Sequence, residues 1–296
     1  MKKSLFLLAW MTITVVGSVY GQFRERANLS LFGGGYAAQE NANNRGYWYG
    51  MYVDYMPIKT NSNWMFGFAA LADRVYFQSN DVLNKYEGSS DEIGGGLAAG
   101  KWSEFLTQRY SGYFGANILL KSIRDNGTGY SVQPNGEIGT YTMQQEDLML
   151  AIGLNINLLK AFGVRENLLP RSQLELNWQK PLKSAKSSFW NNTPIEESMI
   201  WNKASYSAQF RQSIVQIGRL NTLLEPKLVF GYQYYLGDKS QWLSIGPELA
   251  LKKRGWDDFF SVFFFVKEQV GTFEPNLNSR QYVVGFTLKP FNVKKN

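Results

Sequence analysis

Cysteine and histidine are both absent from this 296-residue sequence. Without cysteine the chain has no disulfide, no thiolate nucleophile and no Cys/His zinc site. Without histidine it has no Ser-His-Asp triad. Charged residues make up only 19% of the chain and there are 9 prolines, whereas glycine (28 residues) and aromatic residues (16%) are abundant. These absences exclude several enzyme and metal-site classes before any motif is considered.

The first residues have the organisation of a secretory signal peptide. Lys2 and Lys3 precede an apolar stretch over 5–16, and Val19-Tyr20-Gly21 supplies a cleavage site before Gln22. A membrane-spanning helix needs roughly 20 apolar residues, so this stretch is too short for a comfortable span, and no longer apolar run follows. We therefore expect a signal peptide at 1–21 and a single exported domain at 22–296.

The formal net charge of +7 is spread along the chain. A nucleic-acid-binding surface requires clustered Lys and Arg, and no run of five or six basic residues occurs. We expect no nucleic-acid partner. A mildly basic surface is compatible with a membrane that is rich in anionic headgroups.

Strict alternation of apolar and polar residues is the strongest structural signal. Between Leu148 and Leu158 every second residue is Leu or Ile, and the residues between them are smaller or polar. A helix would scatter these aliphatic side chains around its axis, whereas a strand places them on one face. The pattern recurs at 174–178, 243–251 and 282–288, so it predicts an all-β protein.

The same criteria predict about twelve strands, within a range of 10–14. The predicted strands are 27–37, 46–56, 64–77, 91–102, 108–122, 141–158, 172–182, 201–217, 226–236, 241–252, 256–267 and 280–290.

The connections alternate in length. Those after odd-numbered strands are mostly long: 38–45, 78–90, 123–140, 183–200 and 268–279. Those after even-numbered strands are mostly short: 57–63, 103–107, 218–225 and 253–255. The short 237–240 and the long 159–171 are exceptions. Long loops on one rim and short turns on the other are typical of a transmembrane antiparallel up-and-down β-barrel, with both termini on the short-turn, periplasmic side.

Tryptophans lie near the ends of the predicted strands, where amphipathic rings anchor a barrel at the two membrane interfaces. The expected girdle comprises Trp64, Trp102 and Trp256 beside short turns, and Trp178, Trp201 and Trp242 nearer the opposite ends. A secreted β-sandwich is the main alternative. Its polar faces would be rich in Lys, Glu and Thr, whereas these hold Gly, Ala, Ser, Asn and single charges, which suits the interior of a curved barrel.

With this leader, these strands and a closing strand from Gln281 to Phe291, the chain resembles an outer-membrane β-barrel of the broad group common in Bacteroidota. It departs from that pattern at the end, because five residues follow Phe291 where such proteins commonly end on an aromatic residue. The chain is also similar in length to PorP/SprF-like barrels of the type IX secretion apparatus. Their Asn-Pro-Ala segment is absent after Gln22, so this resemblance is the weaker of the two.

No motif predicts a catalytic or cofactor site. Gly95 to Lys101 has the spacing of a P-loop, but Trp102 replaces the required Ser or Thr and no helix pattern follows. Outer-membrane barrel enzymes such as phospholipases and omptin-type proteases rely on histidine. The acidic pair Glu196-Glu197 is a weak calcium candidate, and solvated rim charge is its simpler explanation. We expect no enzyme activity, no cofactor and no resident metal.

The charges that remain are expected to face the barrel interior, because a Lys or Arg facing lipid near the bilayer midplane costs roughly 2–4 kcal/mol. The lumen-lining candidates are Asp54, Asp73, Lys121, Glu175, Arg211 and Glu248, joined by the aromatic residues Trp48, Tyr52 and Tyr113. Such charges either line a narrow aqueous path or pair across the interior and plug it.

Two functions therefore stay open. The first is a passive small-solute channel, and the second is a non-conducting structural or accessory subunit of an envelope or secretion complex. The expected partners are outer-membrane lipids, together with envelope proteins that contact the long loops or the lipid face. The oligomeric state is not predicted.

Overall fold

A computed structural model of the chain describes residues 26–38, 45–61, 64–80, 84–104, 111–132, 136, 138–158, 172–194, 203–215, 217–219, 222–237, 239–253, 258–271 and 280–293. The expected signal peptide at 1–21 and the mature start at Gln22 lie outside these residues. Within them, no helix is long and apolar enough to cross a membrane.

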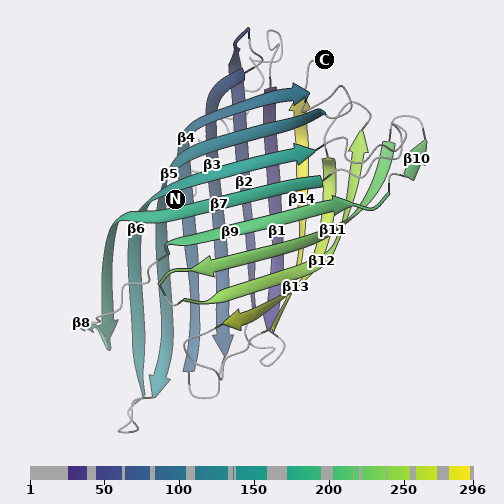
Figure 1. Cartoon of the computed structure of the whole chain (residues 1–296). Coiled ribbons are helices and arrows are strands. Elements are labelled where there is room, and N and C mark those ends of the chain that lie inside the picture. Colours follow the sequence, from purple (N-terminus) through teal and green to yellow (C-terminus); the bar gives the residue numbers. More distant parts are fainter. Residues whose placement is uncertain are drawn as a thin grey trace.

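Twelve long antiparallel strands close into one barrel (Figure 1). They are β1 (Arg26–Ala38), β2 (Arg45–Lys59), β3 (Trp64–Asn80), β4 (Asn84–Glu104), β5 (Ser111–Val132), β6 (Ile138–Leu158), β7 (Ser172–Trp190), β9 (Ser205–Ser213), β11 (Thr222–Tyr235), β12 (Gln241–Lys253), β13 (Asp258–Gly271) and β14 (Arg280–Val293). The short strands β8 (Thr193–Pro194) and β10 (Ile217–Arg219) pair with β7 and β11.

Each long strand pairs with the next along the chain, and β14 pairs with β1 to close the barrel. The predicted all-β, up-and-down architecture with about twelve strands is therefore confirmed. Closure gives each long strand a neighbour on both sides, as a membrane-spanning sheet requires. Beyond Gln179, β7 pairs with β6 and, at its end, with β8. We call the end where β1 begins and β14 ends the terminus end, and the opposite end the loop end.

Alternate residues of each strand point to an outer and an inner face. On β6, Leu148 is 43% exposed, whereas the neighbouring Met149 is completely buried. The Nδ2 atom of Asn117 on β5 donates to the hydroxyl of Tyr52 on β2 at 3.3 Å, across the intervening β3 and β4. Strands that are not neighbours make such a contact only on the concave side of a curved sheet, so Asn117 and Tyr52 mark the inner face.

The outer face carries the apolar belt that the sequence pattern predicts. Exposed outward side chains include Phe66, Phe68, Leu97, Ile118, Leu120, Phe230, Ile245, Leu249, Phe264, Val284 and Phe286. Such a belt is what the outside of a barrel presents to the hydrocarbon of a bilayer.

The four longest strands extend beyond the ranges that the sequence predicts. β4, β5, β6 and β7 contain 21, 22, 21 and 19 residues, and they reach furthest at the loop end, at the lower left of Figure 1. They include much of 78–90, 123–140 and 183–200, so assigning these three segments wholly to loops was wrong. The outward residues of this extension, such as Arg124 and Thr128 on β5, are polar. Polar residues on both faces remove the alternation signal, although the backbone pairing continues.

Candidate functional site

All six charged residues that the sequence assigned to the lumen lie on the inner face. Two of them, Asp73 on β3 and Lys121 on β5, lie on either side of Glu92 on β4. Asp73 pairs in register with Glu92, and the Nζ atom of Lys121 lies 2.7 Å from Oε1 of Glu92. Asp54 on β2 is 4% exposed and accepts a hydrogen bond of 3.2 Å from Nδ2 of Asn28. Glu175, Arg211 and Glu248 belong to a larger network.

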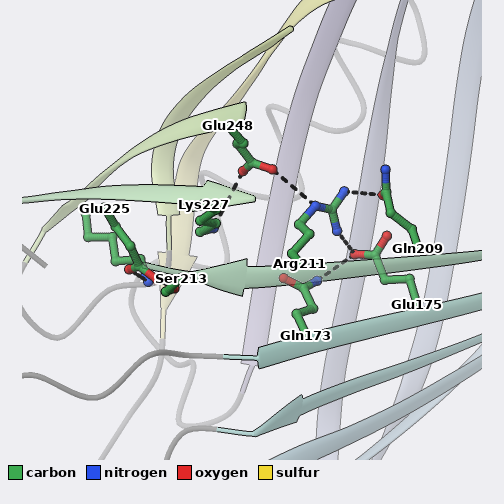
Figure 2. A network of polar contacts seen from close by, with 9 residues as sticks. Gln173, Glu175, Gln209, Arg211, Ser213, Glu225, Lys227 and Glu248 are labelled. Atoms are coloured by element: carbon green, nitrogen blue, oxygen red, sulfur yellow. Dashed lines mark hydrogen bonds and ion pairs between the residues drawn. The ribbon is translucent and has the colours of Figure 1, made fainter. Parts of the chain in front are cut away.

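That network crosses four strands, β7, β9, β11 and β12 (Figure 2). The guanidinium of Arg211 lies between two carboxylates, with Nη1 2.6 Å from Oε1 of Glu175 and Nε 3.2 Å from Oε2 of Glu248. Its Nη2 atom donates to Oε1 of Gln209 at 2.6 Å. On the far side of Glu248, the Nζ atom of Lys227 lies 3.5 Å from Oε1. Opposite charges therefore alternate along the chain of contacts from Glu175 through Arg211 and Glu248 to Lys227.

A deeper ion pair continues the network towards the terminus end. Glu225 on β11 is completely buried, where it contacts the Nζ atom of Lys252 and accepts a hydrogen bond from the hydroxyl of Ser213. Lys252 is 3% exposed. We call the six inner-face residues Glu175, Arg211, Glu225, Lys227, Glu248 and Lys252 the charged wall. Three positive and three negative groups balance there, as buried charges require.

Solvent reaches part of the charged wall. The side chains of Glu175 and Arg211 are 27% and 21% exposed, although both point to the interior. Asn177, two residues further along the inner face of β7, is also exposed. These side chains therefore border open space inside the barrel.

The opposite side of the interior is built differently. Met56, Met65, Ala69, Ala98, Leu119 and Ala151, from β2 to β6, form one buried cluster on the inner face, and Tyr52 packs against it. We call these six residues the apolar wall. Small side chains on β3 and β4 leave the space that Tyr52 occupies on its way to Asn117.

A third inner cluster was missed by the sequence analysis. Lys203, just before β9, contacts Asp125 on β5, and its Nζ atom lies 3.8 Å from Oδ2 of Asp147 on β6. Gln145 donates to the same Oδ2 atom at 2.8 Å. Asp125 was assigned to a loop, and Asp147 was not among the lumen-lining candidates. The alternation of β6 places Asp147 on the face of Met149, which is the signal that identifies it as inward.

Two of the three aromatic residues that were expected to line the lumen lie on the inner face. Trp48 and Tyr52 lie on the inner face of β2, in alternation with the outward Tyr47 and Tyr49. Tyr113 lies in β5 opposite Trp102, both near the end of the described segment.

Two of the six tryptophans that were expected to form the girdle are seen to face outward. Trp64 faces outward at the terminus end, stacked on Phe66 with ring centroids 6.2 Å apart and with the Nζ atom of Lys101 5.5 Å from its ring. Trp178 also faces outward and is 37% exposed. Trp201 and Trp256 lie outside the described residues, as does the calcium candidate Glu196-Glu197.

Trp242 does not belong to an outer girdle, so that expectation was wrong. It shares the inner face of β12 with Ser244 and Glu248, and the Nζ atom of Lys267 lies 4.8 Å from its ring centroid. Position near a strand end does not decide which face a side chain takes; the parity along the strand does.

Ion pairs on the outer face mark one border of the apolar belt. Arg74 binds Asp91 between β3 and β4, with Nη2 2.8 Å from Oδ2, and Arg124 binds Glu146 between β5 and β6 at 2.7 Å. A third pair, Arg280 and Glu268 at 3.0 Å, joins β14 to β13. All three lie on the loop-end side of the belt. No group of three acidic side chains in the described part of the chain is arranged to hold a metal ion.

No protein-family model matches this chain, and no curated protein matches it in sequence. Solved structures with a similar fold include the β domain of the Bordetella autotransporter BrkA, at a TM-score of 0.50 and 10% identity, covering 89% of this chain and 98% of that one. The transport unit of the Escherichia coli autotransporter AIDA-I matches at a TM-score of 0.50 and 11% identity, covering 94% of this chain and 96% of that one. A KdgM porin aligns with 88% of this chain, but at a TM-score of 0.31 that likeness carries no argument. The closed twelve-stranded barrel with its outward apolar belt has the fold of outer-membrane β-barrel proteins, and this supports a location in the outer membrane.

Proposed function

We propose that this barrel is a passive channel for small polar or charged solutes. The observation that carries the proposal is the charged wall, where Arg211 and Glu175 point to the interior and yet remain partly exposed to solvent. A plug would bury both partners completely, as Glu225 and Lys252 are buried. A path lined by charges of both signs passes small polar solutes without binding any one ion tightly.

The orientation follows from the general architecture of such barrels, in which short turns face the periplasm and the termini lie on that side. We therefore place the terminus end in the periplasm and the extended strands β4 to β7 on the outside of the cell. The apolar belt contacts outer-membrane lipids. This orientation puts the charged wall in the periplasmic half of the path.

Planar-bilayer recording of the purified, detergent-extracted barrel tests this function. Folding is checked first by the shift in gel migration on boiling. We expect steady single-channel current in the wild type and higher cation selectivity in Arg211→Gln, because Glu175 and Glu248 then lack their shared positive partner. Arg124→Gln is the matched control, since it removes an arginine from an outer-face pair. A folded barrel that passes no current would overturn the proposal.

A second candidate, an accessory subunit of an envelope complex, is favoured by a groove on the outer face. The groove has a volume of about 1040 Å³ near the loop end, and mostly outward-facing residues of β14 and β1 to β5 line it. Tyr47 and Tyr76 stack there with ring centroids 4.6 Å apart, beside Arg45 and Glu87. Crosslinking in native membranes tests this candidate: a partner lost in Tyr47→Ala but kept in Tyr49→Phe, together with absence of current, would support it.

A further inference from the structure

Aromatic side chains gather on the inner face at the loop end. Eight of them lie within three residues of the loop-end terminus of their strands: Tyr36, Trp48, Phe77, Tyr86, Tyr141, Trp190, Tyr235 and Trp242. We call these eight residues the mouth aromatics. Each of them is half-buried. They come from eight different long strands and so occupy several sides of the opening, and Tyr52 and the charged wall lie deeper.

Several of these rings lie flat against the barrel wall because glycines face them. A Cβ atom on Gly46 would lie 2.5 Å from Cε1 of Tyr36, and one on Gly88 would lie 2.6 Å from Cζ of Phe77. A Cβ atom on Gly34 would likewise lie 2.5 Å from Cζ2 of Trp48. Any larger residue at these glycines would push the ring away from the wall.

The pairing register aligns these residues across the wall. Tyr36 pairs with Gly46, Gly46 with Phe77, and Phe77 with Gly88. The rings of Phe77 and Tyr86 stack with centroids 5.6 Å apart. A glycine of the next strand lies against the rings of Tyr36 and Phe77, and both side chains, which lie on the inner face, are half-buried.

Polar donors stand beside two of the aromatic rings. The Nζ atom of Lys267 lies 4.8 Å from the ring centroid of Trp242 and 3.1 Å from Oε1 of Gln233. The Nε2 atom of Gln233 donates to the hydroxyl of Tyr235 at 2.7 Å. This side of the mouth therefore combines flat apolar surfaces with ammonium, amide and phenol groups.

We infer that the mouth aromatics bind a carbohydrate chain, which names the solute class of the channel and so rests on the proposed function. A sugar ring presents an apolar C–H face and a rim of hydroxyls. The aromatic rings of residues such as Trp48 and Phe77 pack against the C–H face of the sugar, and donors such as Lys267 and Gln233 bind its hydroxyls. A small inorganic ion makes no use of flat apolar faces, and an alkane makes no use of the neighbouring polar groups.

Isothermal titration calorimetry of the folded, detergent-solubilised full chain with maltohexaose tests the inference. We expect saturable binding, and no binding of polyethylene glycol of similar mass, which lacks ring faces. Trp48→Ala and Phe77→Ala should each weaken binding about 2- to 10-fold, the effect of losing one stacked aromatic contact. The matched control is Tyr47→Ala, which changes the neighbouring outward residue. A variant that has lost its heat-modifiable migration is replaced by Trp48→Leu or Phe77→Leu, which keep the volume and remove the aromatic face.

Bilayer recording with the same sugar separates the two proposals. Maltohexaose should interrupt the current reversibly, and less often in Trp48→Ala. A barrel that conducts but neither binds the sugar nor is blocked by it would overturn the carbohydrate inference and leave the channel standing. Binding that is equally weakened by Tyr47→Ala would also overturn it. Binding without any current would uphold the carbohydrate surface and overturn the channel.

Discussion

The apolar wall on β2 to β6 is built from buried methionine, leucine and alanine side chains, whereas the charged wall on β7 to β12 is built from ion pairs. Leu119 and Ala98 on the first wall are each 4% exposed, while Arg211 on the second is 21% exposed. Packing on one wall is stabilised by burial of apolar area, and on the other by pairing of opposite charges. In one closed sheet, therefore, one side of the interior is a packed core and the other side contacts water.

The largest expected effect comes from breaking the buried ion pair of the charged wall. Glu225→Leu removes the carboxylate that Lys252 contacts, and Lys252 is only 3% exposed. Leaving that ammonium without its partner should lower the free energy of unfolding by about 3–5 kcal/mol. Guanidinium unfolding in detergent, followed by tryptophan fluorescence, measures the change.

The double variant Glu225→Leu with Lys252→Met tests whether the stability depends on the pairing of these two charges. Both charges are then replaced by apolar side chains, and most of the lost stability should return. A double variant that is as unstable as the single one would show that this wall does not depend on charge pairing.

The apolar wall should respond to loss of volume instead. Leu119→Ala removes a buried side chain from this cluster, and we expect a loss of about 2–3 kcal/mol, the lower part of the range for such a truncation, because neighbouring side chains relax partly into the space. The same denaturant titration measures it. If the loss stayed below about 0.5 kcal/mol, the cluster would not be a packed core.

A smaller effect is expected at the contact between Tyr52 and Asn117. Tyr52→Phe removes the hydroxyl that accepts the 3.3 Å hydrogen bond and should cost about 1 kcal/mol of unfolding free energy. A double-mutant cycle with Asn117→Ala isolates the pair. Additive effects in that cycle would mean that the two side chains do not interact.

The smallest effect is expected outside the barrel. Arg124 and Glu146 are 56% and 60% exposed, so their ion pair is largely screened by solvent. Arg124→Gln should change the unfolding free energy by less than about 0.5 kcal/mol. A change as large as that of Glu225→Leu would remove the distinction between inner and outer charges.

Much of this arrangement can be read from alternation alone. The pattern from Leu148 to Leu158 identifies one strand and both of its faces, and the same reasoning places all six lumen candidates on the inner face. It also places Trp242 inward, since Leu243 and Ile245 take the outer face, but closeness to a strand end obscured that parity.

Other features depend on register between distant segments. Lys203 reaches Asp125 and Asp147 only because the strands bring three separate segments together, and no local pattern encodes that meeting. The extension of β5 to Val132 was missed because Gly, Asn and Ser residues that are typical of turns continue the ladder there. Local composition indicates a turn, and the pairing with β4 and β6 overrides it.

Water is expected to follow the charged wall and to avoid the apolar wall. The absence of cysteine from the chain makes single-cysteine labelling direct. Ser207 lies on the inner face beside Gln209, Ala208 faces outward on the same strand, and Ala98 lies in the apolar wall. In bilayers, Ser207→Cys should react quickly with a charged methanethiosulfonate reagent and change the current, while Ala208→Cys and Ala98→Cys should react slowly. Equal rates at Ser207→Cys and Ala98→Cys, or faster reaction at Ala98→Cys, would show that water does not prefer the charged wall to the apolar wall.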